Sequence, residues 1–109
     1  MAYDETLARR LQTAFRKSAG ITEKRMFGGI AFMLNGNMCA GVAGKNLMLR
    51  VGPEKYADLL KQPHAQIMDF TGRPMTGFIY VEPAGIASDR DLDRWLNYAL
   101  AYVNTLPAK

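Results

Sequence analysis

Apolar residues recur at helical spacing near the start of the chain, in the segment DETLARRLQTAFRKSAG at residues 4–20. Leu7, Leu11, Ala14 and Phe15 lie three or four positions apart and would form one face of a helix. The segment opens with acidic residues, carries basic residues near its end and closes on a glycine. This order complements the helix dipole and supplies a stop, so it predicts an amphipathic helix.

Two further helices are predicted downstream. The segment GPEKYADLLKQP, residues 52–63, places one proline at a first helical position and another just beyond the end. In the segment 83–107, Ser88 and Asp91 have the spacing of a capping box, and acidic residues fill the first turn. The apolar positions of this last helix share one face and are Leu92, Trp95, Leu96, Ala99, Val103 and Leu106.

The segments between these helices have the residue pattern of β-strands. The dipeptide Asn35-Gly36 favours a tight hairpin turn, and the other connections are also short. An antiparallel meander is therefore expected. The predicted strands cover residues 22–34, 38–42, 47–51, 65–70 and 75–82.

Two consecutive glycines, Gly28 and Gly29, interrupt the first of these strands, within KRMFGGIAFML. Glycine weakens a strand interior because it has high backbone entropy in the unfolded chain and no side chain to pack. The simplest interpretation is a β-bulge or sharp bend, with a positive φ at one of the two residues. A close approach of another group to the backbone is the alternative.

The expected order of elements is α-β-β-β-α-β-β-α in a single domain covering residues 1–109. Short connections between strands predict an α+β fold of two layers. It would consist of an antiparallel sheet of about five strands with the helices on one face.

Alternation along the strands assigns residues to the two faces of this sheet. Ile30, Phe32 and Leu34 would face the helices. The opposite face would carry Ala31, Met33, Cys39 and Met48, which are unusually apolar for a solvent-exposed surface. Monomers seldom leave such a patch open, so a homodimer that covers it is predicted, with edge-strand pairing as a competing route.

The composition is that of an ordinary globular protein, and a cytoplasmic location is the default expectation. The net charge is +4, and residues 1–52 carry 8 Lys/Arg against 3 Asp/Glu, or +5. A basic half can attract nucleic acid or an acidic protein face, although a solvated surface is the simpler interpretation. One cysteine excludes an internal disulfide and fits a reducing compartment. No apolar run has the length of a membrane span, and the N-terminal segment does not resemble a signal peptide.

The residues that usually carry catalysis do not form a pattern. His64 is the only histidine and Cys39 the only cysteine, and their spacing fits neither a metal site nor a nucleophile pair. The glycine-containing segments lack the phosphate-loop pattern. We therefore expect no catalytic residues, no metal, no cofactor and no enzyme activity.

Arginines are the most distinctive polar residues. Arg25, Arg50 and Arg73 each lie beside or within a predicted strand. For Arg50, an ion pair with Asp69 or Glu23 across the sheet is the simpler interpretation. The alternative is a site for an anion or an acidic partner.

On the first helix, Arg9 and Arg16 lie seven positions apart, away from the apolar stripe, as do Arg10 and Lys17. A solvated face is the simpler interpretation of these four residues, and a partner-binding basic stripe is the alternative.

Three blocks of the sequence resemble the N-terminal domain of the TfoX/Sxy family. They are TEKRMFGGIAFMLNGNMCAGVAGKNLMLRVGPEKY, then MDFTGRPMTGFIYVEP and DLDRWLNYAL, and they occur in that order. The resemblance implies a two-layer fold similar to secretion-chaperone-like folds and a regulatory, non-catalytic role. Longer members promote competence genes together with the cyclic-AMP receptor protein and carry a second domain. This chain is expected to be a stand-alone version of the first domain.

The leading hypothesis is thus a small, non-catalytic regulatory domain that acts through protein contact, with a protein partner in transcription control. A direct, weakly specific nucleic-acid binder is the alternative. It would use Arg9, Arg10, Arg16, Lys17 and Arg25, with binding that weakens as salt rises. An uncharacterised enzyme ranks last.

Overall fold

The computed structural model describes residues 3–16, 18–26, 29–70 and 73–108. Three helices, α1 (Glu5–Phe15), α2 (Pro53–Leu60) and α3 (Asp89–Val103), accompany six strands and one short 3₁₀ helix, η1 (Pro83–Ile86). The strands are β1 (Ile21–Met26), β2 (Gly29–Leu34), β3 (Asn37–Ala43), β4 (Asn46–Arg50), β5 (Ala65–Phe70) and β6 (Arg73–Val81).

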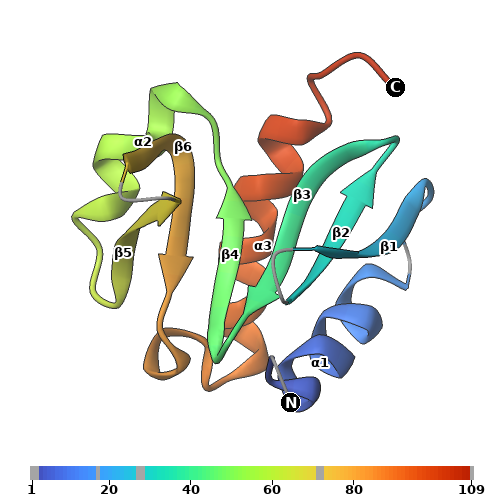
Figure 1. The fold of residues 1–109 in the computed structure, drawn as a ribbon, viewed down its shortest axis with the longest axis horizontal. Coiled ribbons are helices and arrows are strands. Elements are labelled where there is room, and N and C mark those ends of the chain that lie inside the picture. The colour runs from blue at the N-terminus through green and yellow to red at the C-terminus, as the bar shows by residue number, and fades with distance from the viewer. Residues whose placement is uncertain (1–2, 17, 27–28, 71–72, 109) are drawn as a thin grey trace.

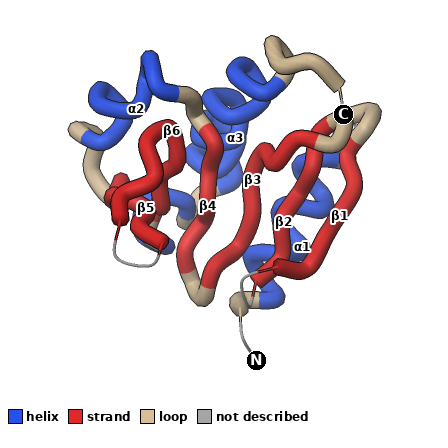
Figure 2. The backbone as a smooth tube through the Cα atoms, turned by 45° about the horizontal axis from the view of Figure 1, so that its top comes forward, coloured by secondary structure: helices blue, strands red, loops and turns tan. Residues whose placement is uncertain are grey.

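All six strands pair antiparallel in one sheet with the order β1-β2-β3-β4-β6-β5. Helices α1 and α3 lie behind this sheet, and α2 connects β4 to β5 near its upper end (Figures 1 and 2). The two-layer α+β fold expected from the sequence is therefore confirmed, with the helices on one side.

Side-chain caps fix the starts of both long helices. The Asp4 carboxylate accepts hydrogen bonds from the backbone N–H groups of Thr6 and Leu7, at 2.9 and 3.1 Å. The Ser88 hydroxyl accepts one from the Asp91 N–H, at 3.1 Å. Each bond satisfies a backbone donor that has no partner within the helix.

The main core lies between the helices and the sheet. Its largest fully buried side chains include Trp95 of α3, Leu11 of α1 and Phe32 of β2. Phe32 and Phe15 pack with ring centres 5.4 Å apart. The apolar stripes read from the sequence thus meet the predicted inner face of the sheet, and their burial is the main stabilising contribution to this fold.

The prediction of one long first strand is wrong, whereas the predicted bend or positive φ at Gly28 lies outside the described residues. Residues 21–34 form two strands, and Met26 pairs with Gly29 as the last rung of an antiparallel hairpin. Gly29 opens β2 without a positive φ, whereas Gly28 lies outside the described residues. A Cβ atom on Gly29 would overlap the Val42 carbonyl oxygen of β3, so Gly29 is required by a close approach of backbone.

The next hairpin has the expected turn. Asn35 and Gly36 join β2 to β3 with φ values of 52° and 85°. Positive φ at both central residues matches the right-handed twist of the two strands, and Asn-Gly adopts it at low cost.

No helix in the described part of the chain combines the length and the apolar character needed to cross a bilayer.

Candidate protein-interaction face

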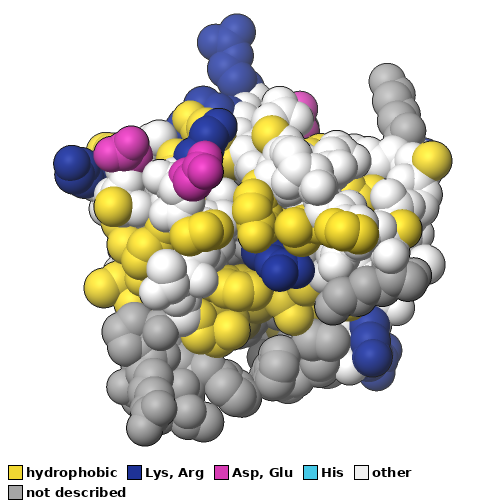
Figure 3. Space-filling model, turned by 90° about the horizontal axis from the view of Figure 1, so that it is seen from above, with side chains coloured by type: hydrophobic (Ala, Val, Ile, Leu, Met, Phe, Trp, Pro, Cys, Tyr) yellow, Lys and Arg dark blue, Asp and Glu magenta, His cyan; other side chains and the backbone are white. Residues whose placement is uncertain are grey.

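A second, smaller apolar cluster covers the face of the sheet that the helices leave free. We call it the methionine face. Its buried members are Ala31, Met48 and Met68, and its partly buried members are Met33, Met38, Met75, Phe78 and Tyr80. All five methionines whose side chains are described belong to it, and none of them packs in the helix-side core. Figure 3, in which the molecule is seen from above, shows hydrophobic side chains across the middle and lower left of the view, around Lys or Arg side chains.

Strand register brings these residues together. Ala31 of β2, Gly41 of β3 and Met48 of β4 lie side by side across three strands, and Tyr80 of β6 continues the row. A Cβ atom on Gly41 would come 2.6 Å from the Met48 methyl carbon. The Met48 side chain therefore occupies the space above β3 that a larger residue at position 41 would take.

This packing corrects the expected exposure of the face. Ala31 is 0% exposed and Met48 is 4% exposed, although no helix covers them. The Met48 side chain packs over the small residues Ala31 and Gly41 of the neighbouring strands. Met33 is only partly buried and is the predicted dimer-face residue most accessible to a partner.

Cys39 was assigned to this face, and that assignment is wrong. Phe32 pairs with Ala40 and Met33 pairs with Met38, so Cys39 is an extra residue in β3, as in a β-bulge. The extra residue changes the alternation, and Cys39 packs in the helix-side core with no exposed surface. Burial raises the pKa of its thiol to about 12, while the positive charge of Arg50 opposes the rise.

Arg50 lies at the end of β4, opposite Phe78 of β6. Its guanidinium carbon is 5.6 Å from the centre of the Phe78 ring and 5.8 Å from that of Tyr102 on α3. These are cation–π distances. Two aromatic side chains thus hold the charge beside the methionine face.

The expected ion pair between Arg50 and Glu23 does not form, because strands β2 and β3 separate β1 from β4. Glu23 instead accepts a hydrogen bond from the Gln12 side chain at 2.9 Å. The side chain of Asp69 is outside the described residues.

The other predicted basic residues do not join Arg50. Arg9 and Arg16 are exposed on α1, and Arg25 is exposed on the edge strand β1. Arg73 begins β6 opposite Phe70, and its side chain is not among those described. The arginines are therefore distributed over the molecule rather than collected into one anion site.

Sequence reasoning missed Met38, Met68, Met75, Phe78 and Tyr80 as members of the methionine face. Met75 and Phe78 are three residues apart, so simple alternation places them on opposite sides. However, the pairing of β5 with β6 shifts between Ile67 and Asp69, and Gly77 has φ +91°. A glycine inside an apolar strand was the available signal for this irregularity.

The part of the chain that the structure describes contains no group of three or more His, Cys, Asp or Glu residues able to hold a metal ion.

The described residues form a two-layer α+β domain whose free sheet face is rich in methionine. The family model for the TfoX N-terminal domain matches residues 13–102, which is most of the 109-residue chain. The protein therefore belongs to the TfoX N-terminal domain family. No match was found among curated proteins.

Proposed function

We propose that this protein is a non-catalytic regulatory domain that works through protein contact, with the methionine face as its contact surface. One observation carries the proposal: all five described methionines gather on the single sheet face that the helices leave free. Methionine side chains are flexible and polarisable, so they adapt to partner surfaces at little cost. We place this contact in transcription control in the cytoplasm, the role that the resemblance to the TfoX/Sxy family implies.

Charge defines the kind of protein partner that this face would accept. Arg50 places a positive charge at the margin of the apolar cluster, and the chain as a whole carries +4. The best match is an apolar surface with a carboxylate at its edge, because a charged hydrogen bond to Arg50 would then fix the register of the complex.

Self-association is the first use that we propose for the methionine face. Two copies that stack these faces would bury the remaining exposed surface of Met33, Met38 and Met75. A competing route runs through the edge strand β5, where Ile67 is 51% exposed. Substitutions on the methionine face and substitutions on the sheet edge would therefore disrupt different homodimers, which distinguishes the two routes.

Met33→Lys should raise the dimer dissociation constant by about tenfold or more, because it places a charge within the buried centre of the interface. Sedimentation equilibrium over a wide concentration range measures the change. Ala57→Lys on the exposed side of α2 adds the same charge away from the face and should behave like the wild type. If Ile67→Lys alone disrupts the dimer, or if the wild type stays monomeric at high concentration, self-association through this face is wrong.

Direct nucleic-acid binding is the second candidate, favoured by the exposed Arg9 and Arg16 on α1. The surroundings weaken it. Arg9 and Arg10 line a cavity of about 620 Å³ together with Asp89 and Asp93, and Arg10 lies 3.2 Å from the Asp89 carboxylate. These carboxylates would repel phosphate groups.

Duplex DNA should consequently bind weakly and without sequence preference. Fluorescence anisotropy should show dissociation constants no tighter than the micromolar range at low salt, weakening on the order of tenfold at physiological salt. Arg9→Gln combined with Arg16→Gln should remove most of the residual signal. Tight binding that persists at physiological salt and prefers a promoter over a scrambled duplex would put this candidate first.

A further inference from the structure

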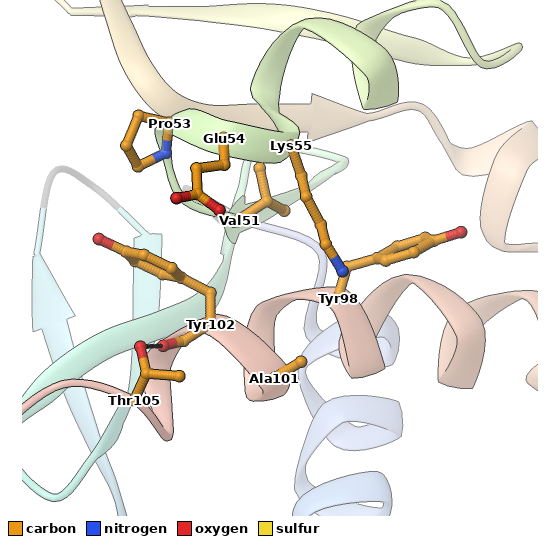
Figure 4. Close-up of a pocket in the computed structure, with 8 residues that line it drawn as sticks. All are labelled: Val51, Pro53, Glu54, Lys55, Tyr98, Ala101, Tyr102 and Thr105. Atoms are coloured by element: carbon orange, nitrogen blue, oxygen red, sulfur yellow. Dashed lines mark hydrogen bonds between the residues drawn. The ribbon is translucent and has the colours of Figure 1, made fainter.

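We infer that the cavity between the first turn of α2 and the end of α3 binds a small planar aromatic molecule that carries a carboxylate or a phosphate. The cavity has a volume of about 430 Å³, within the range of ligand sites in proteins. It lies on the helix side of the domain, and Arg50, which contacts both Phe78 and Tyr102, is the residue that it shares with the margin of the methionine face. Figure 4 shows its lining.

Aromatic walls give the cavity its first preference. Tyr98 and Tyr102 lie four residues apart on α3, and both line the cavity. Ala101 and Thr105 of the same helix region extend this wall, and Val51 and Pro53 lie opposite (Figure 4). An aromatic ring that enters between the α3 wall and the opposite residues Val51 and Pro53 meets aromatic and apolar surface, where offset or edge-to-face contacts are favourable.

Tyr102 is held in place before any ligand arrives. Gly52, at the start of α2, has φ +86°, and a Cβ atom there would overlap the Tyr102 ring. The ring therefore packs directly against the backbone of Gly52, while the Arg50 guanidinium carbon lies 5.8 Å from its centre. A wall fixed in this way loses little conformational entropy on binding.

Positive charge gives the second preference. The Lys55 side chain reaches from α2 toward α3 (Figure 4), and its Nζ lies 5.8 Å from the centre of the Tyr98 ring. Among the lining residues Glu54 is the one carboxylate, and Arg50 adds a further positive charge beside Tyr102. The lining itself therefore carries one charge of each sign, from Lys55 and Glu54, and Arg50 beside Tyr102 supplies the additional positive charge that would favour an anionic group.

The Tyr98 side chain is contacted by residues outside the cavity lining. A hydrogen bond from Gln62 and the nearby Arg94 lower the pKa of the Tyr98 hydroxyl, with a further contribution from Lys55. Gln62 is itself held by Arg94, whose guanidinium donates to the Gln62 side-chain oxygen at 2.7 Å. These contacts surround the Tyr98 hydroxyl and hold its ring in place beside the cavity.

The test is a titration of the ¹⁵N-labelled protein, followed by amide chemical shifts, with four probes. Benzoate and phenyl phosphate carry both a ring and an anion, benzamide carries only the ring, and inorganic phosphate carries only the anion. Saturable shifts at residues around the cavity are expected with the first two, with dissociation constants in the millimolar range or tighter. The other two probes should bind at least about tenfold more weakly, because a charged hydrogen bond or a ring contact is lost.

Matched variants locate the site. Lys55→Gln should weaken benzoate binding about fivefold to tenfold, whereas Lys61→Gln removes the same charge from the other end of α2, outside the lining, and should have little effect. Ala101→Phe at an exposed lining position should fill the cavity and abolish binding while the fold persists. Equal effects of the two lysine variants, shifts confined to the methionine face, or no saturable binding would each overturn the inference.

Discussion

Gly29→Ala should be among the most destabilising single substitutions in this protein. The added methyl group would overlap the Val42 carbonyl oxygen, which is backbone and part of the central β2–β3 pairing. Relief requires the two strands to separate locally, with loss of ladder hydrogen bonds and of packing around Ile30. We expect a loss of more than about 3 kcal/mol in the free energy of unfolding, a value reached only by severe core or backbone changes.

Gly44→Ala is the matched control for this experiment. Gly44 has φ +60°, and a Cβ atom there would meet nothing within 4 Å. The cost should be limited to the left-handed backbone conformation, about 1 kcal/mol. Urea unfolding followed by circular dichroism measures both variants. A Gly29→Ala protein as stable as Gly44→Ala would mean that β2 and β3 do not approach each other as described.

The Cys39 thiol should be almost inert in the native protein. Burial raises its pKa from the usual 9.0 to about 12, and its side chain has no exposed surface. Because the thiolate is the reactive form, the shift should lower the reactive fraction of the thiol at pH 8 by about a thousandfold. Reaction with a chromogenic aromatic disulfide measures the rate, with the urea-unfolded protein as the control. Labelling of the native protein at the rate of a free thiol would contradict the placement of Cys39 in the core.

The same shift predicts how stability depends on alkaline pH. The folded protein holds the Cys39 proton more tightly than the unfolded chain does, so this contribution is fully present below the usual pKa of 9.0 and decreases as pH rises toward about 12. The Cys39→Ala variant should lack this component of the decrease, although it leaves a small cavity. The two proteins are therefore compared by the slope of the free energy of unfolding against pH and not by its absolute value.

The helices and the sheet class could be predicted because local signals and the global fold agree. Asp4 and Ser88 mark helix starts with side-chain oxygens, and the apolar stripes that follow them are the faces that become buried. Asn35-Gly36 specifies its own turn. By contrast, the split between β1 and β2 was missed because strand-like residues flank the glycine pair on both sides, so residue pattern alone does not separate one strand from two.

The candidate site was only partly predictable. Alternation placed Ala31, Met33 and Met48 on the face away from the helices, and the structure places them together there. It failed for Cys39 because one extra residue in β3 shifts the parity of the strand. The α2–α3 cavity was missed altogether. Its walls depend on a contact between Gly52 and Tyr102, and these two residues are far apart in the sequence.

The central claim is that the methionine face mediates protein contact, beginning with self-association. The most direct measurement uses protein labelled with ¹³C at the methionine methyl groups, observed by NMR over a dilution series with a soluble paramagnetic agent. We predict that the signals of Met33, Met38 and Met75 shift as concentration rises and become protected from the agent, in step with the dimer fraction from sedimentation. Methyl signals that remain unchanged and equally accessible while the protein associates would contradict the account.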